Sequence, residues 1–136
     1  MPDGMDQRYR DSYAAMRRML KMLYDAGVPI VAGTDAMAGF SLHTELEQYV
    51  AAGIPAPKAL QIVTLGAARV MKRDGETGSI ARGKAADLIL VDGDPAAKIS
   101  DIRRVVTVVR GDRIDEAAAL DVALGVRPVS PAARAH

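Results

Sequence analysis

A long amphipathic pattern opens the chain. Apolar side chains recur at intervals of three and four residues from Tyr13 to Leu23, and basic side chains lie on the other side. This spacing is that of one face of an α-helix, so the sequence predicts a helix over residues 9–26. Gly27 suits the left-handed conformation in which many helices end.

The next pattern is a short apolar run without alternation. The residues from Val28 to Ala32 have no polar face and end at Gly33-Thr34-Asp35. Such a run is typical of a strand covered on both sides in a parallel sheet. In an α/β barrel, catalytic groups lie at the ends of such strands, which makes Asp35 the first candidate for a functional residue. An aspartate after a strand also commonly forms a turn or caps a helix, and the local pattern leaves both interpretations open.

Two further helices are predicted downstream. The first starts at Ser41, a suitable N-cap, and ends near residue 51, with Glu45 expected to complement the helix dipole from its first turn. The second starts at Pro57, which suits the first turn of a helix, and ends near residue 71. Its buried stripe is expected to comprise Leu60, Val63, Ala67 and Val70.

From residue 76 onward, short apolar runs alternate with turn residues. The pattern predicts strands over 86–91 and 102–109, and Gly111-Asp112 predict a two-residue hairpin turn after the second strand. An alanine-rich stretch from Glu116 predicts a short helix to about residue 124, and disorder is expected beyond residue 126. Four aspartates in this region lack the ligand spacing of a calcium loop, so they are expected to form turns: Asp87, Asp92, Asp94 and Asp101.

Composition narrows the classes of protein. The 136 residues are enough for one domain with a core, since 49% are hydrophobic. With 18 basic and 17 acidic residues, the charge favours neither nucleic acid nor another acidic molecule as a partner. The absence of cysteine excludes disulfides and thiolate metal sites. No apolar run reaches membrane-spanning length and the N-terminus lacks a signal-peptide core, so we expect a cytoplasmic protein unless an upstream segment directs it elsewhere.

An ordered series of short motifs runs along the chain. It comprises Ala26-Gly27-Val28-Pro29-Ile30, Gly33-Thr34-Asp35-Ala36, Leu42-His43-Thr44-Glu45-Leu46, Ala52-Gly53-Ile54, Pro57-Lys58-Ala59-Leu60, Thr64 with Ala67-Ala68-Arg69, Gly78-Ser79-Ile80 and Gly83-Lys84-Ala85-Ala86-Asp87-Leu88. In order and spacing this series resembles the metal-dependent amidohydrolase superfamily, specifically its imidazolonepropionase-like and prolidase-like branch. The resemblance covers roughly residues 10–115.

The resemblance implies an α/β fold that is the C-terminal fragment of a (β/α)8 barrel, since a complete barrel needs about 250 residues. Residues 1–75 would hold the last helices and the final strand of the barrel. Residues 76–115 would form the C-terminal part of a composite β-sandwich, followed by a short helix and a disordered tail over 116–136. Because the N-terminal strands of that sandwich are absent, the valine-rich strand is expected to leave an unprotected edge.

The resemblance also implies a chemistry. In the family, the aspartate that ends the eighth barrel strand is a metal ligand and general base, and only Asp35 matches it. Thr34 and His43 would lie on the substrate side or behind the ligands, although a lone histidine at a helix start is usually structural. The complete enzyme would hydrolyse carbon–nitrogen bonds of small or cyclic amides with a divalent metal, for which zinc is expected.

The family's other ligands are an HxH pair, a bridging lysine and two later histidines. This chain has only His43 and His136, so we expect it to be inactive alone. Its expected partners are a small-molecule amide substrate and either the missing N-terminal barrel portion or a second copy of itself, with neither nucleic acid nor membrane. The alternative is a non-catalytic assembly or interaction module derived from an amidohydrolase C-terminus.

Overall fold

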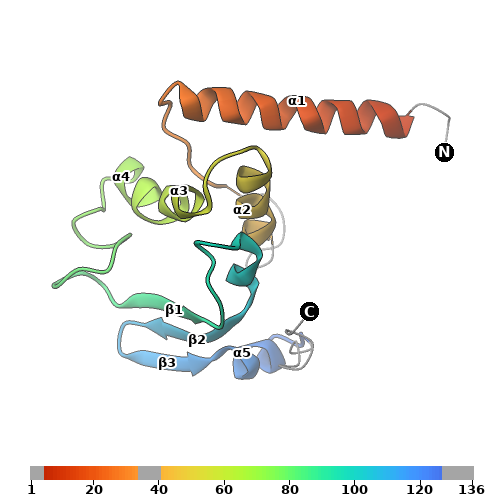
Figure 1. Ribbon diagram of the computed structural model, residues 1–136. Helices are drawn as coiled ribbons and strands as arrows, with labels where there is room; N and C mark the ends of the chain where they lie inside the picture. Colours follow the sequence, from red (N-terminus) through yellow and green to blue (C-terminus); the bar gives the residue numbers. More distant parts are fainter. Residues whose placement is uncertain (1–4, 34–40, 127–136) are drawn as a thin grey trace.

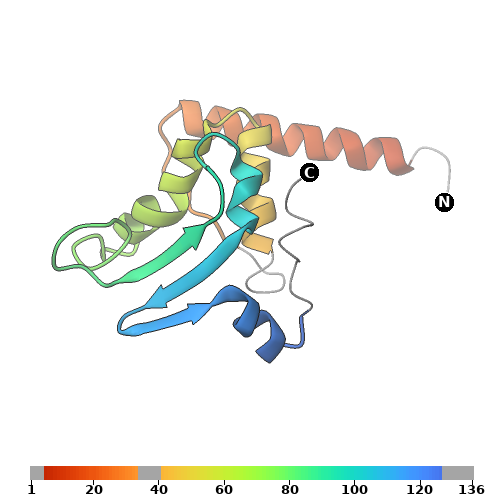
Figure 2. The same cartoon turned by 60° about the horizontal axis from the view of Figure 1, so that its bottom comes forward.

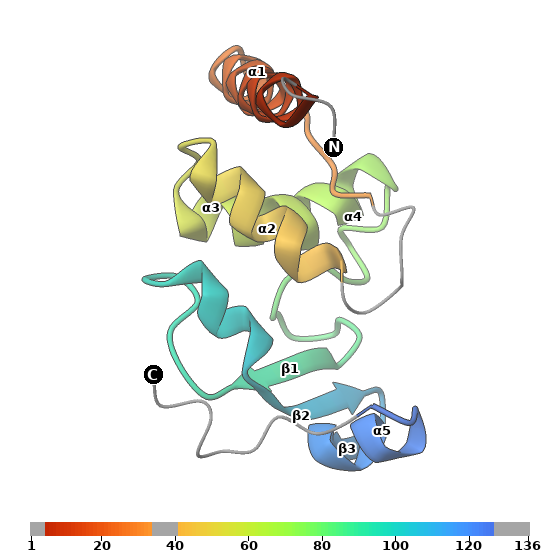
Figure 3. The same cartoon turned by 90° about the vertical axis from the view of Figure 1, so that its right-hand side faces the viewer.

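The computed structural model describes residues 5–33 and 41–126, which form three layers (Figure 1). The long helix α1 lies on one side, a group of helices α2 to α4 lies in the middle, and a small β-sheet lies on the other side. Viewed at right angles, the same three layers follow one another from α1 to the sheet (Figure 3). The expected tail at 127–136 lies outside the described residues.

The first predicted helix is confirmed as α1, Met5–Asp25. Gly27 ends it with a φ of 74°. The Gly27 amide donates to the Tyr24 carbonyl, and the Val28 amide donates to the Leu23 carbonyl, both at 3.0 Å. These two bonds form the Schellman arrangement, which satisfies carbonyls that the helix end leaves free.

The apolar face of α1 is largely uncovered. Leu20 and Tyr24 pack against the core, whereas Met16 and Met19 are 62% and 58% exposed. Among the described elements α1 packs on α2, and only its C-terminal half lies over the helical layer (Figure 1). The amphipathic pattern therefore predicted the helix correctly, but the apolar face of the helix is only partly buried in the described structure.

The predicted strand over residues 28–32 is wrong for the described chain. The segment after α1 has no strand pairing, and Val28 and Val31 are 46% and 42% exposed. Ile30 and Ala32 do pack against the core. A strand exists only when neighbouring strands pair with its backbone, and none of the described strands lies beside this segment. The apolar run correctly predicted that part of this segment packs against the core, but it could not predict whether another strand would form hydrogen bonds with its backbone.

The core joins the helical layer to the segment that precedes the sheet's central strand. Helix α2, Ser41–Ala51, contributes the buried residues Leu46 and Tyr49. They cluster with four residues from three other segments, and the largest fully buried side chains of the cluster are Leu46 and Ile54. The four further members of the cluster are Ile54, Ala59, Ile99 and Ile102.

The helix predicted over 57–71 is confirmed as three consecutive helical segments. These are α3, Ala56–Gln61, the π-helical turn η1, Ile62–Gly66, and α4, Ala67–Val70. Within the π turn, the Thr64 hydroxyl donates to the Leu60 carbonyl at 2.7 Å. Val70 is 52% exposed, and Ala59 and Ala68 are buried instead. A π turn adds a residue to the helix, so positions beyond it no longer follow the predicted α-helical stripe.

The sheet has three antiparallel strands, β1 (Asp87–Val91), β2 (Val105–Arg110) and β3 (Arg113–Glu116), in the order β1-β2-β3 (Figure 2). The hairpin turn is confirmed, because Arg110 pairs with Arg113 and Gly111 has a φ of 63°. The helix α5, Ala117–Ala123, follows as predicted. The valine-rich strand was expected to leave an open edge, but β2 pairs on both sides and is central.

The second strand also starts later than predicted. Residues Ile99–Arg103 form a 3-10 helix, η2, which turns the side chains of Ile99 and Ile102 into the core. Of the four aspartates expected to form turns, Asp87 instead begins strand β1, because its backbone pairs with Arg110, and Asp101 lies within η2. Asp94 does form a turn before η2. The Asp94 carboxylate accepts from the amides of Ala96 and Ala97 at 3.0 and 3.2 Å, and the Asp101 carboxylate accepts from the Asp94 amide at 3.1 Å.

The described part of the chain is thus α/β, with two helical layers, α1 and the group α2 to α4, and one small antiparallel sheet. That these layers are pieces of a barrel and of a composite sandwich stays a prediction. In the segments 5–33 and 41–126, no helix is both long and apolar enough to cross a membrane.

Candidate functional site

The first candidate residues, Thr34 and Asp35, lie outside the described residues. Their neighbour Gly33 is described, as is the whole of α2, which starts eight positions later. The site is therefore built from what surrounds Gly33 and the first turns of α2. His43, the third candidate, belongs to these turns.

The carboxylate of Glu45 joins Gly33 to α2. The Gly33 amide donates to Glu45 Oε1 at 3.3 Å, and the Tyr49 hydroxyl donates to the same oxygen at 2.7 Å. Residues 45 and 49 lie one turn apart on the same face of the helix, which brings the hydroxyl to the carboxylate. Glu45 does not act on the helix dipole from the first turn as expected, because the first turn of α2 holds no acidic residue.

Tyr49 is a fixed partner for this carboxylate. Its side chain belongs to the core, and the residue is only 4% exposed. Burial raises the pKa of Tyr49 well above its ordinary value, and the hydrogen bond to Glu45 and the negative charge of Glu45 raise it further. The phenol therefore stays protonated and keeps donating to the carboxylate.

A second polar group lies on the same helix. Arg103 of η2 donates to both carboxylate oxygens of Glu47, at 2.7 and 2.9 Å, and to the Thr44 hydroxyl at 3.0 Å. The hydrogen bond from Arg103 lowers the pKa of Glu47, and the same bond raises the pKa of Arg103. The pair is partly exposed, so solvent screens it, but its two parallel bonds fix the relative orientation of α2 and η2.

His43 lies one turn before Glu47. Desolvation by burial lowers its pKa, the positive charge of Arg103 lowers it further, and the negative charge of Glu47 opposes both effects. The imidazole is therefore held in its neutral form at neutral pH, the form that accepts a hydrogen bond or binds a metal. Its role toward Asp35 stays a prediction.

The described residues do not assemble a metal site on their own. Over 5–33 and 41–126, no three histidine, cysteine, aspartate or glutamate side chains come together in a way that would hold a metal ion. A divalent metal would therefore need ligands from beyond these segments, with Asp35 as the chain's own candidate.

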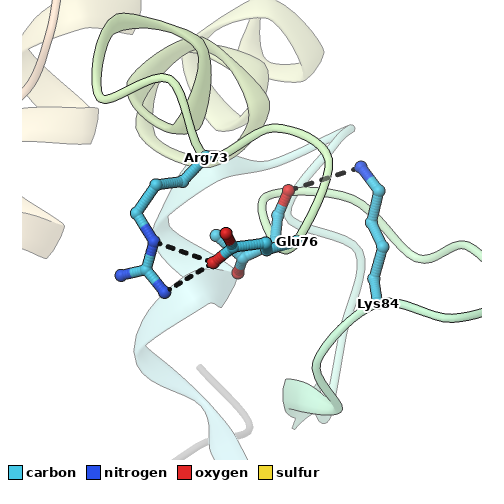
Figure 4. A network of polar contacts seen from close by, with 4 residues as sticks. Arg73, Glu76 and Lys84 are labelled. Atoms are coloured by element: carbon cyan, nitrogen blue, oxygen red, sulfur yellow. Dashed lines mark hydrogen bonds and ion pairs between the residues drawn. The ribbon is translucent and has the colours of Figure 1, made fainter.

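Another polar network lies away from α2, in the loop after α4. Arg73 pairs with Glu76 at 3.0 Å (Figure 4). The Lys84 ammonium donates to the Ser79 hydroxyl at 2.8 Å and to the carbonyls of Asp74 and Thr77. Because the ammonium donates to acceptors of its own loop, this network stabilises the conformation of the loop.

The sequence alone did not predict the two contacts that organise this region, between Glu45 and Gly33 and between Arg103 and Glu47. The spacing of Glu45 and Tyr49 on one helix face was a usable signal for their hydrogen bond. Nothing local signals the pairing of Arg103 with Glu47, because 56 positions separate them.

Comparisons with known proteins bear on this region. The sequence model of the amidohydrolase family matches residues 10–114. Imidazolonepropionase from Caldanaerobacter subterraneus subsp. tengcongensis is 36% identical over 85 residues, covering 59% of this chain and 20% of that protein. A 5-methylthioadenosine/S-adenosylhomocysteine deaminase from Thermoanaerobacter pseudethanolicus is 31% identical over 94 residues, covering 60% of this chain and 21% of that protein.

Solved structures share the fold. A Xaa-Pro dipeptidase with methionine bound in its active site superposes with a TM-score of 0.69 and 35% identity, covering 74% of this chain and 25% of that one. Molinate hydrolase superposes with a TM-score of 0.68, covering 82% of this chain and 29% of that one, and at 24% identity it supports the fold alone. The chain spans about a fifth of the length of the curated relatives that it matches.

Proposed function

Because this chain belongs to the amidohydrolase family, we propose that it forms the C-terminal part of a metal-dependent hydrolase that acts on carbon–nitrogen bonds of small or cyclic amides. The observation that carries the proposal is the family match over residues 10–114, which contains Asp35 and both described anchors of its neighbourhood, Gly33 and α2. Two similar proteins, an imidazolonepropionase and a Xaa-Pro dipeptidase, support a carbon–nitrogen bond as the target.

Within this function, Asp35 is the residue that we assign to the chemistry. A carboxylate can ligate a divalent metal, for which zinc is our candidate, and can carry a proton between water and the leaving nitrogen. Thr34 and His43 are assigned to the substrate side or to support of the ligand. The neutral imidazole of His43 is suited to accepting a hydrogen bond in either place.

The remaining ligands are assigned to a barrel portion outside this chain. The described segments hold no three-residue metal cluster, and a catalytic zinc site commonly needs three protein ligands. Accordingly, no step of catalysis is assigned to the described residues alone, and the isolated chain is expected to be inactive.

The same barrel portion is our proposed partner for the exposed face of α1. A groove of about 270 Å³ runs along this helix, and its lining is almost entirely apolar. The extended segment after α1 likewise has exposed valines and no strand beside it in the described chain. The matched relatives are about five times as long as the segment they share with this chain, which supports a further length of polypeptide as the proposed partner. The groove is lined by Tyr13, Met16, Arg17, Met19, Leu20, Leu23 and Gln48.

A chimera tests the proposed function. Residues 10–114 would replace the matching segment of the Caldanaerobacter imidazolonepropionase, and turnover of that enzyme's own substrate would be measured with added zinc or manganese. The proposal predicts turnover well above that of the same enzyme truncated before the segment. A chimera that folds cooperatively, binds metal and yet gives no turnover would contradict it and favour the non-catalytic assembly module.

A further inference from the structure

Gly33 is the last described residue before Asp35, and its backbone is held in an unusual way. The segment over residues 28–33 has no strand ladder in the described chain, so regular sheet hydrogen bonds do not fix it. Its apolar side is anchored by Ile30 and Ala32, which pack against the core. Its polar anchor is the bond from the Gly33 amide to the carboxylate of Glu45, twelve positions later.

We propose that Glu45 is a positioning residue, whose carboxylate holds the backbone at Gly33 against α2, two positions before Asp35 in the sequence. The bond to Gly33 stands on the structure, and its consequence for Asp35 rests on the proposed function. A ligand side chain must be held to within about 0.5 Å of its productive place, and the backbone two residues before it is an effective point of control.

The position of Glu45 is itself determined by the core. The Tyr49 hydroxyl is 2.7 Å from the same oxygen that accepts from Gly33, and Tyr49 is 4% exposed. A buried hydroxyl without an acceptor is unfavourable, so Tyr49 holds the Glu45 carboxylate in the orientation that meets it. The chain of contacts therefore leads from the core through Tyr49 and Glu45 to Gly33.

Glu47 provides a matched control on the same helix. It is also a partly buried carboxylate of α2, but its two oxygens are occupied by Arg103 and none of its hydrogen bonds reaches Gly33. Replacing either glutamate by glutamine removes one negative charge from the same helix. Only the substitution of Glu45 should change the environment of the Gly33 amide, because only Glu45 accepts its hydrogen bond.

The amide of Gly33, observed by NMR in the ¹⁵N-labelled chain, tests the proposal. In Glu45→Ala its resonance is expected to move and its hydrogen exchange to accelerate by several-fold, up to about tenfold, because one hydrogen bond is lost. Glu45→Gln keeps an amide oxygen as acceptor, so its Gly33 amide should exchange at a rate between those of wild type and Glu45→Ala. Tyr49→Phe should give a smaller change of the same kind, and Glu47→Gln none.

The outcomes separate this inference from the proposed function. If Glu45→Ala does not fold, Glu45→Gln and Tyr49→Phe decide the matter, and a Gly33 amide unchanged in both overturns the inference. Asp35→Asn should leave the Gly33 amide unchanged, so this readout stands whether or not Asp35 binds metal. In an active chimera, Glu45→Gln is further expected to lower kcat by about 10–100-fold with little change in KM, whereas unchanged kcat would overturn the positioning role.

Discussion

Arg103 and Glu47 form a two-pronged ion pair across 56 positions of the sequence, with nitrogen–oxygen distances of 2.7 and 2.9 Å. Arg103 ends η2, directly before the central strand of the sheet, and Glu47 lies in the middle of α2. The pair therefore ties the sheet to the helix that carries Glu45 and His43. The buried contacts of Ile99 and Ile102 with the helical core lie alongside it.

Loss of this pair is expected to lower stability more than loss of a local pair. Arg103→Ala should reduce the free energy of unfolding by about 1 kcal/mol, a modest figure because the Arg103 side chain is 43% exposed and solvent screens the ion pair. The free energy of unfolding of Arg103→Lys should lie between those of the wild type and Arg103→Ala, since an ammonium cannot make both parallel bonds. Urea unfolding followed by circular dichroism would measure the change.

The control is Arg73→Ala, which removes the more exposed pair between Arg73 and Glu76, three positions apart. Its effect should stay within about 0.5 kcal/mol, as for most surface substitutions. Equal losses of unfolding free energy in Arg73→Ala and Arg103→Ala would show that the long-range pair stabilises the fold no more than a local pair does.

Stability is expected to fall as the pH drops below about 6.5. His43 has a lowered pKa in the folded chain, because of burial and then of Arg103, with Glu47 opposing. The unfolded chain therefore binds more protons in this range, and protonation favours unfolding. Thermal unfolding at pH 7.5 and 5.5 should show this loss of stability, and His43→Gln should diminish the loss.

Glu47 acts in a lower pH range. Its pKa is also lowered, so the stability that the ionised Glu47 contributes is lost only as the pH falls below 4.5, the ordinary pKa of a glutamate. A pH dependence identical in wild type and His43→Gln would contradict the assignment.

Gly78 is expected to tolerate no side chain. Its φ is 83°, and a Cβ there would lie 2.5 Å from the Ala68 Cβ and 3.1 Å from the backbone at Leu65. Gly78→Ala should therefore lose about 2–4 kcal/mol in the free energy of unfolding, from backbone strain and overpacking together. Gly83→Ala, with a φ of 87° but open space, should lose only about 1–2 kcal/mol. Gly75→Ala, with open space and no such φ, should change stability by less than 1 kcal/mol, and a loss as large as that of Gly78→Ala would refute the packing argument.

The isolated chain is expected to self-associate through α1 when the proposed barrel portion is absent. Met16 and Met19 leave much apolar surface on this helix exposed. Size-exclusion chromatography with light scattering should detect oligomers, and Met16→Lys should shift the chain toward monomer. Arg18→Glu, a charge change on the other side of the helix, should not. A wild-type monomer with a sharp cooperative transition would favour a self-sufficient interaction module.

Local patterns in the sequence were enough to predict the helices and the hairpin. The spacing from Tyr13 to Leu23 predicted α1, and Gly111-Asp112 predicted the turn between β2 and β3, because both depend on neighbouring residues only. The predicted strand over 28–32 failed, since a strand also requires a partner that the pattern does not specify. Val70 was misplaced because the π turn at Ile62–Gly66 changes the helical register, and no residue pattern announced that turn.

The candidate site was only partly accessible to the same reasoning. The place of Asp35 after an apolar run, together with the resemblance to a family, indicates it as the functional residue, but Asp35 lies outside the described residues. The sequence indicates Glu45 only as a charged residue near the start of a helix. Its contact with Gly33 joins residues twelve positions apart and depends on the tertiary structure. Arg103 was missed because its partner is distant in sequence.

The central claim, that Asp35 carries the chemistry of this chain, is tested most directly by its substitution in the chimera. Zinc- or manganese-dependent turnover would be compared for the parent chimera, Asp35→Asn and Asp87→Asn, the last removing an exposed carboxylate of β1. We expect Asp35→Asn to lose more than about a hundredfold in kcat, beyond the 10–100-fold typical of residues that only orient a ligand, and Asp87→Asn to remain active. An Asp35→Asn chimera that turns over substrate as fast as its parent would contradict the claim.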